Sequence, residues 1–196
     1  LTIRCNSGMP IPLVDLRIVD EDMKDVAHDA KAVGEVVVRS PWLTQGYLKD
    51  PENSERLWAG GYLHTQDVGH IDAEGYLQIT DRIKDVIKSG GEWILSLEIE
   101  NLVSQHPAVS ETAVIGMKDE KWGERPLVLV VQKAGSAVTE KAIKDHVRKF
   151  SQTGQISPYA ILARVLMVEQ IDKTSVGKVN KRLLREKFAG RVLRQR

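Results

Sequence analysis

The chain has 196 residues, enough for one large or two small domains, and 42% of them are hydrophobic, as in ordinary globular proteins. Its 28 Lys and Arg balance 27 Asp and Glu, so charge gives no reason to expect nucleic acid or an anionic membrane as a partner. The single cysteine, Cys5, excludes a disulfide framework and fits the cytoplasm, and no run approaches the roughly 18 apolar residues of a transmembrane segment.

The first third of the chain is patterned as strands and turns. A short helix is expected near 50–57, and otherwise no strong helical pattern occurs before residue 80. The expected strands are β-rich runs bounded by Pro, Gly and Asp residues: Leu13–Val19, Glu35–Arg39, Tyr62–Thr65, Val68–Ile71 and Tyr76–Thr80. Residues 1–81 are therefore predicted to form a small β-barrel or sandwich subdomain.

After Asp81 the pattern changes to alternating strands and helices. A β-hairpin is predicted from strands at 83–87 and 92–95, with Lys88–Gly91 as its turn. Ser96 is the expected N-cap of a helix that ends before Pro107.

Further strands and helices complete the C-terminal part. Strands are expected at 109–116, 127–132 and 161–168, and helices are expected to be capped by Thr139 and Asn180. Residues 82–196 are therefore predicted to form a separate α+β domain, a β-hairpin plus a small mixed sheet with helices. No Pro/Gly/Ser linker separates it from residues 1–81.

The stretch Lys173–Lys178 (KTSVGK) places a lysine directly after a glycine. A Walker phosphate loop requires G-x-x-x-x-G-K-[ST], but here Asp172 occupies the first glycine position and Val179 follows the lysine. The stretch is therefore not a P-loop. A lysine in a glycine-containing loop can still reach an anion as a flexible point charge.

Three stretches occur in a fixed order: His64–Gly69 (HTQDVG), Asp81–Ile94 (DRIKDVIKSGGEWI) and Lys173–Lys178. Together they resemble the closing motifs of the adenylate-forming superfamily, which includes acyl-CoA synthetases, carrier-protein adenylation domains and beetle luciferases. The resemblance covers essentially the whole chain. The sequence SGGEWI is most similar to that of bacterial medium- and long-chain fatty acyl-CoA synthetases.

The resemblance implies two half-reactions. A fatty acid attacks the α-phosphorus of ATP to give acyl-AMP, and the thiol of CoA then displaces AMP, with a C-terminal lid domain rotating between the steps. Residues 1–81 would be the β-rich end of the large AMP-binding domain, and residues 82–196 would be the lid domain. The phosphate loop, acyl pocket and Mg²⁺-binding glutamate would lie in an upstream domain, so the isolated chain is expected to be inactive. The five histidines show no metal-ligand spacing.

The resemblance assigns roles in the adenylation step to three residues. Asp67 would accept hydrogen bonds from the ribose diol, and Arg82 would donate to the ribose or phosphate. Lys178 would be the catalytic lysine, since a mobile cation stabilises the charge that grows between carboxylate and α-phosphate. Ordinary alternatives remain open: a turn cap for Asp67, a surface ion pair for Arg82 and a solvated side chain for Lys178.

Other residues would serve the rotation and the thioester step. Asp81 matches the hinge position, where backbone angles change as the lid rotates. Gly90, Gly91 and Glu92 match the loop that flanks the pantetheine arm of CoA, and glycine permits the close backbone approach. The ordinary alternative for Asp81 is an aspartate at a strand end, and that for Gly90 and Gly91 is a plain hairpin turn. Trp93 would lie either in the core or against a bound ligand.

Some features are weaker or depart from the family pattern. The family usually has glycine before the ribose aspartate, where this chain has Gln66, and proline where it has Asp172. Trp122–Glu124 resembles a family loop near CoA, and Lys84 and Lys88 could meet CoA phosphates or only solvent.

Three alternatives to a CoA ligase remain: a carrier-protein-directed adenylation enzyme, a non-catalytic binding module, and a degenerate homologue suggested by Gln66. Acyl-chain length is not readable from these residues, and a homodimer stays open.

Overall fold

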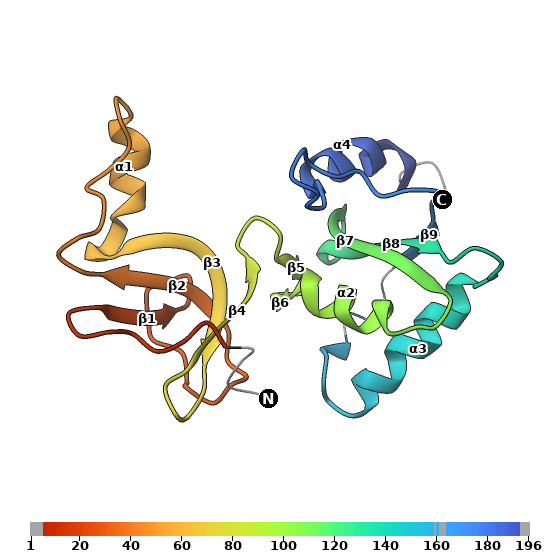
Figure 1. The fold of residues 1–196 in the computed structure, drawn as a ribbon, viewed down its shortest axis with the longest axis horizontal. Coiled ribbons are helices and arrows are strands. Elements are labelled where there is room, and N and C mark those ends of the chain that lie inside the picture. Colours follow the sequence, from red (N-terminus) through yellow and green to blue (C-terminus); the bar gives the residue numbers. More distant parts are fainter. Residues whose placement is uncertain (1–5, 159, 161–163, 193–196) are drawn as a thin grey trace. The chain divides into compact units, whose positions relative to one another are not determined.

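The computed structural model describes residues 6–158, 160 and 164–192, and the chain divides into two compact units, Leu1–Lys84 and Asp85–Arg196 (Figure 1). Cys5 lies outside the described residues, as do positions 161–163 of the last expected strand. No helix among the described residues is long and apolar enough to cross a membrane.

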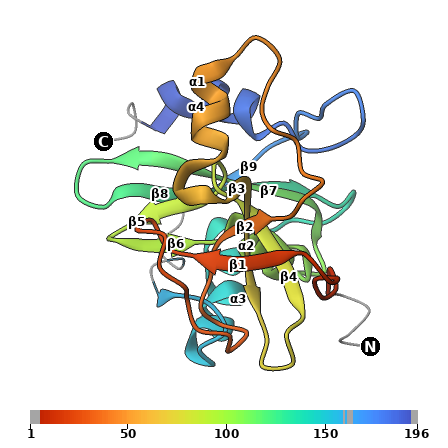
Figure 2. The same cartoon turned by 90° about the vertical axis from the view of Figure 1, so that its left-hand side faces the viewer.

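The first unit contains a four-stranded antiparallel sheet in the order β1-β2-β3-β4 (Figure 2). Alternating apolar residues of its strands form a buried cluster around Ile18, Val36 and Ile71, as expected when one face of a sheet is covered. Its elements are β1 (Asp15–Val19), β2 (Gly34–Arg39), α1 (Pro51–Leu57), a 3₁₀ turn η2 (Ala59–Gly61), β3 (Leu63–Ile71) and β4 (Leu77–Arg82).

The sheet corrects two expectations. In the described part of the chain β1 and β4 do not pair with each other, so the sheet is open and not a closed barrel. Strand propensity is local, whereas closure depends on pairing between distant strands. The runs 62–65 and 68–71 are one strand, β3, which the left-handed backbone of Gln66 (φ 64°) and a bulge at Val68/Gly69 interrupt. This irregularity breaks the alternation on which the sequence prediction depended.

The second unit is an α+β domain whose sheet has the order β6-β5-β8-β7, with β9 parallel to β8. Helices α2 and α3 cover one face, where Ile99 and Ile143 pack against Val128, and α4 covers the other through Leu184 and Phe188 (Figure 1). The bounds are β5 (Ile87–Ser89), β6 (Glu92–Ile94), α2 (Ser96–Ser104), β7 (Val109–Asp119), β8 (Gly123–Gln132), α3 (Glu140–Gln152), β9 (Arg164–Met167) and α4 (Lys181–Val192).

Two of the three predicted helix caps are confirmed. Thr139 accepts a hydrogen bond from the Ala142 N–H at 3.2 Å, and Asn180 accepts one from the Leu183 N–H at 3.1 Å. The cap at Ser96 is wrong, because α2 is preceded by Leu95 with no side-chain cap, and Ser96 is fully buried.

The predicted strand 83–87 is also wrong for most of its length. Residues 83–85 form a turn, and β5 begins only at Ile87. The isoleucines at both ends suggested a strand, but the intervening residues connect the two units and pair with no strand along this stretch.

Candidate functional site

Asp67 and Arg82 lie opposite each other on adjacent strands of the first unit. They are register partners on β3 and β4, and Arg82 Nε lies 3.2 Å from Asp67 Oδ1. The Arg82 side chain is 62% exposed and that of Asp67 27%, so both groups can reach a ligand from solvent. The structure thus brings together the two residues that the sequence assigned to nucleotide binding.

The backbone before Asp67 is irregular and strongly supported. Thr65 Oγ1 donates to the Val36 carbonyl at 2.7 Å and accepts from the Asp67 N–H at 3.1 Å. The Ile83 N–H donates to the Gln66 carbonyl at 3.0 Å. These bonds fix the turn of the chain from which the Asp67 carboxylate projects.

Asp81 lies on β4 with only 3% of its surface exposed, and its carboxylate accepts a hydrogen bond from the Arg82 N–H at 2.8 Å. Asp81 is the next-to-last residue of β4, and the two units divide a few residues later, after Lys84. Arg82 ends the strand, and turn residues 83–85 follow.

Gly90 and Gly91 form the tip of the β5–β6 hairpin in the second unit. Both have left-handed backbones, with φ of 61° and 87°, which glycine adopts without steric cost. The Gly90 N–H donates to the Trp122 carbonyl at 2.9 Å, and Ser89 pairs with Gly123. The segment 122–124, noted from the sequence as a weaker candidate, therefore supports this turn.

The side chains next to the turn are partly engaged. Glu92 accepts a hydrogen bond from Ser157 Oγ at 2.7 Å. Lys88 Nζ lies 5.7 Å from the centroid of the Trp93 ring, and the Lys88 backbone N–H donates to the Glu124 carboxylate at 3.1 Å. Glu92 is thus tied to the segment after α3, which leaves the glycine backbone as the open part of the hairpin.

Lys178 lies in a compact exposed loop before α4. Lys173 and Val179 form an antiparallel bridge, the Thr174 N–H donates to the Lys178 carbonyl at 2.7 Å, and Gly177 has a left-handed φ of 80°. The Lys178 side chain is exposed. The loop therefore has a defined backbone and presents a flexible cation to solvent.

A buried polar cluster, which the sequence reasoning missed, anchors the helix after this loop. Lys181 Nζ lies 2.9 Å from Glu100 Oε1 and donates to Ser96 Oγ at 2.7 Å, with both charged side chains about nine-tenths buried. Glu100 also accepts from the Val114 N–H at 2.8 Å. The cluster joins α4 to α2 and β7. The alternation of charge and apolar residues in these segments gave no signal for it.

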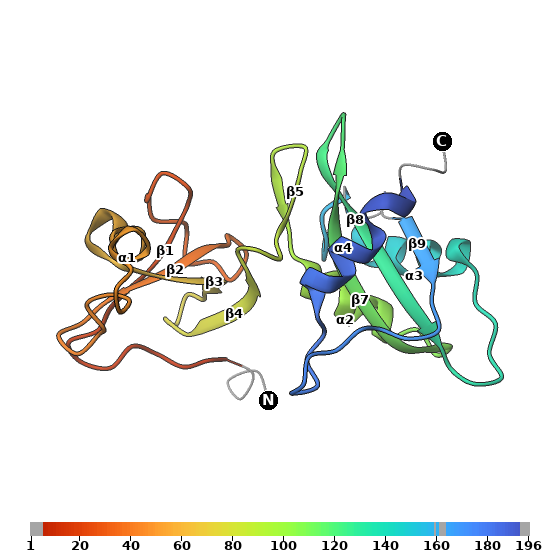
Figure 3. The same ribbon diagram turned by 90° about the horizontal axis from the view of Figure 1, so that it is seen from above.

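The two candidate regions of the second unit project from opposite sides. Figure 3 shows the β5–β6 hairpin on one side of the domain and the segment before α4 on the other. The hairpin with Gly91 and the loop with Lys178 therefore cannot face one point at the same time.

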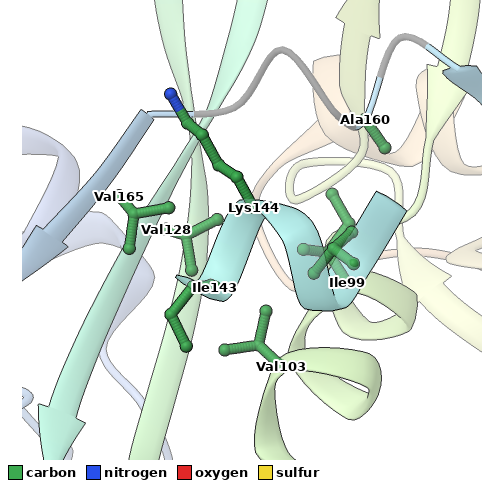
Figure 4. A pocket seen from close by; sticks show the side chains of 8 residues that line it. Ile99, Val103, Val128, Ile143, Lys144, Ala160 and Val165 are labelled. Atoms are coloured by element: carbon green, nitrogen blue, oxygen red, sulfur yellow. The ribbon is translucent and has the colours of Figure 1, made fainter. Parts of the chain in front are cut away.

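Metal-ligating side chains and cavities are two further features of the described residues that bear on ligand binding. Among residues 6–158, 160 and 164–192 no three His, Cys, Asp or Glu side chains are grouped to hold a metal ion. A cavity of about 10 Å³ lies between α2, α3 and β8, lined by Ile99, Val103 and Ile143 (Figure 4). That volume admits one water at most, and the cavity is a gap in the apolar core.

Comparison with known proteins identifies the family. Residues 98–178 match the family described as AMP-binding enzyme C-terminal domain. The chain is 41% identical over 189 residues to a long-chain-fatty-acid–CoA ligase of Thermus thermophilus, covering 96% of this chain and 34% of the relative. It is 32% identical to a medium-chain-fatty-acid–CoA ligase of Ectopseudomonas oleovorans, covering 99% and 34%. The chain belongs to the adenylate-forming superfamily.

Solved structures of superfamily members support this assignment. ATP-bound MatB from Rhodopseudomonas palustris matches with a TM-score of 0.81 and 29% identity, over 94% of this chain and 36% of that one. The amide bond synthetase McbA from Marinactinospora thermotolerans matches with a TM-score of 0.78 and 33% identity, over 95% and 37%. The chain thus spans about a third of the length of the superfamily members that it matches, which are CoA ligases and related adenylate-forming enzymes.

Proposed function

We propose that the chain is the C-terminal portion of an ATP-dependent fatty acyl-CoA ligase. Residues 1–81 would be the β-rich end of the large AMP-binding domain, and residues 82–196 would form the lid domain. The observation that carries the proposal is the placement of the Lys178 loop and the Gly90–Gly91 hairpin on opposite sides of the second unit. A lid with two such sides serves two half-reactions by rotating between them.

In adenylation, Asp67 would hold the ribose diol of ATP through its carboxylate, and Arg82 would orient that carboxylate while donating toward the nucleotide. Lys178 would enter with the lid and place its ammonium group beside the carboxylate oxygen that attacks the α-phosphate. Because negative charge grows there only during the reaction, this cation stabilises the transition state more than the bound substrates.

In thioester formation, the β5–β6 hairpin would replace the lysine at the reaction centre. The Gly90–Gly91 backbone, which carries no side chains, would border the pantetheine arm while the CoA thiol attacks acyl-AMP. Asp81 would absorb the backbone rotation at the end of β4. Mg²⁺ would be bound by the upstream domain, and the cytoplasm is the proposed location.

The fatty-acid substrate is supported by the long- and medium-chain ligases among the relatives. The similarity to an amide bond synthetase favours an amine as a second candidate acceptor. Incubating the full-length protein with fatty acid, ATP and either CoA or an amine, and identifying the product by mass spectrometry, separates thioester from amide formation.

The deciding experiment measures the two half-reactions separately in full-length protein carrying Lys178→Ala. We expect adenylation to fall about 100-fold or more, on the scale of a lost transition-state donor, while thioester formation from supplied acyl-AMP and CoA is retained. Lys173→Ala is the matched control, since it also removes an exposed cation from this loop. Unlike Lys178, Lys173 is proposed to have no catalytic role, and its ammonium group pairs with Glu111 at 2.8 Å. Unchanged adenylation in Lys178→Ala would refute the assigned role.

The isolated chain is expected to be inactive under this proposal, because the phosphate loop and acyl pocket are assigned to the upstream domain. The test is pyrophosphate release by the purified 196-residue chain with ATP and a fatty acid. Release above the level of a Lys178→Ala chain would show that these residues suffice for adenylation.

A further inference from the structure

Gln66 holds a backbone conformation that its side chain disfavours. Its φ is 64°, in the left-handed region where the Cβ atom crowds the following carbonyl oxygen. Such a residue keeps this conformation only when surrounding contacts over-determine it. Gln66 directly precedes Asp67, so the contacts that hold it also set the direction of the Asp67 carboxylate.

A buried carboxylate from the neighbouring strand makes those contacts. Glu35 of β2 is 9% exposed, and its Oε1 accepts the Gln66 backbone N–H at 3.2 Å. The side-chain amide of Gln66 lies 3.5 Å from the same oxygen. One buried carboxylate oxygen therefore meets both the main chain and the side chain of the strained residue.

Glu35 is itself fixed by His64. The ring Nδ1 lies 2.8 Å from Glu35 Oε2, and the ring Nε2 donates to the Ala59 carbonyl at 3.0 Å. Their side chains are 13% and 11% exposed, so the pair is shielded from water. The imidazole thus connects the η2 turn to Glu35 Oε2, and the other carboxylate oxygen of Glu35, Oε1, contacts Gln66.

These contacts lie apart from the pair that would meet the nucleotide. Asp67 pairs with Arg82 across β3 and β4, whereas Glu35 contacts Gln66 from β2, held there by His64 of β3. Glu35 therefore cannot act on the ribose directly in this arrangement. It can act only through the backbone of Gln66.

We propose that Glu35, held by His64, is a positioning residue that fixes the left-handed turn at Gln66 and thereby aims Asp67 at the ribose of ATP. This inference rests on the proposed nucleotide-binding role of Asp67. Glycine adopts the same φ without support. The inference therefore predicts that Glu35 is needed only while residue 66 carries a side chain.

The test is a double-mutant cycle in the full-length protein, with AMP affinity measured by calorimetry and the KM for ATP measured in adenylation. Glu35→Leu fills the same space without an acceptor, and we expect it to weaken AMP binding roughly tenfold, with the KM for ATP rising and kcat changing less. Glu35→Gln, which keeps an acceptor, is expected to restore most of the affinity. In the Gln66→Gly background, Glu35→Leu is expected to cost about twofold or less.

Additive effects of Glu35→Leu and Gln66→Gly would overturn the inference, because they would show that Glu35 acts independently of the strained residue. If Glu35→Leu alone does not fold, the test is whether the double variant Glu35→Leu/Gln66→Gly folds. If adding Gln66→Gly does not recover folded protein, the inference is likewise overturned. Asp67→Asn separates the two proposals. If it leaves AMP affinity unchanged, the ribose role itself is wrong. If it weakens binding while the cycle is additive, only the role of Glu35 fails.

Discussion

Arg185 of helix α4 donates to Asp85, the first residue of the second unit, at 2.7 Å. The two side chains are 30% and 15% exposed, so the pair is more shielded than an ordinary surface ion pair. It joins the start of the second unit to the helix that follows the Lys178 loop.

Arg185→Met tests the contribution of this pair to the stability of the second unit. We expect the free energy of unfolding of the second unit to fall by about 1 kcal/mol, because the shielded Asp85 carboxylate loses a charged donor. Arg182→Met, at an exposed position on the same helix, is the control and should change stability by less than about 0.5 kcal/mol. Equal effects of the two changes in chemical denaturation would contradict the assignment.

The Lys181–Glu100 pair should behave as a buried ion pair. Lys181→Met leaves the Glu100 charge buried, and we expect it to destabilise the second unit by about 3 kcal/mol. Adding Glu100→Gln removes that charge and keeps an acceptor for the Val114 N–H, so the double variant should recover a large part of the loss. Denaturant titration of the three variants measures both quantities. An equally unstable double variant would show that burial of charge is not the cause.

Gly91 can be tested against a glycine of matched geometry. Gly91 and Gly154 both have positive φ, 87° and 73°, and a Cβ added at either meets no atom within 4 Å. Alanine at each should therefore cost a similar backbone strain, about 1–2 kcal/mol. Only Gly91→Ala should slow thioester formation, by roughly tenfold, since only the hairpin is proposed to approach CoA. Equal rates in both full-length variants would argue against that approach.

Local sequence signals predicted much of the fold. Thr139 and Asn180 cap their helices as expected, because a cap depends on residues within one turn. Ser96 has the same local signal but lies buried against Lys181, and that contact joins residues 85 positions apart. The open form of the first sheet was likewise missed, since it depends on pairing between distant strands.

The candidate site likewise contains residues that local motifs predict and residues that only distant contacts explain. The motifs identified Asp67 and Arg82, which the structure places as register partners, and Gly90 and Gly91, which it places at a hairpin tip. Gln66 was recognised only as a departure from the family pattern. Its left-handed backbone and its support by Glu35 depend on the pairing of β2 with β3, which no local pattern encodes.

Two glutamates in the first turns of their helices should respond to pH in opposite ways. Glu98 and Glu140 both lie in the first turn of a helix, α2 and α3, where the helix dipole favours negative charge. Burial raises the pKa of Glu98 above its usual value of 4.5. The pKa of Glu140 is lowered, chiefly by the hydrogen bond from Lys144 at 2.7 Å and also by the Val165 N–H, against an opposing effect of burial.

The sign of each effect follows from proton linkage. Between pH 4.5 and the raised pKa of Glu98 the folded state holds more protons than the unfolded state, so this residue costs stability as the pH rises through that range. Glu140 gives stability that is present above pH 4.5 and is lost as the pH falls through its lowered pKa. At neutral pH, Glu98→Gln should therefore raise the melting temperature, and Glu140→Gln should lower it. At a pH below both folded pKa values the two variants should differ little from the parent chain. Melting temperatures of the two variants measured from neutral to acidic pH check this, and shifts of the same sign at neutral pH would contradict it.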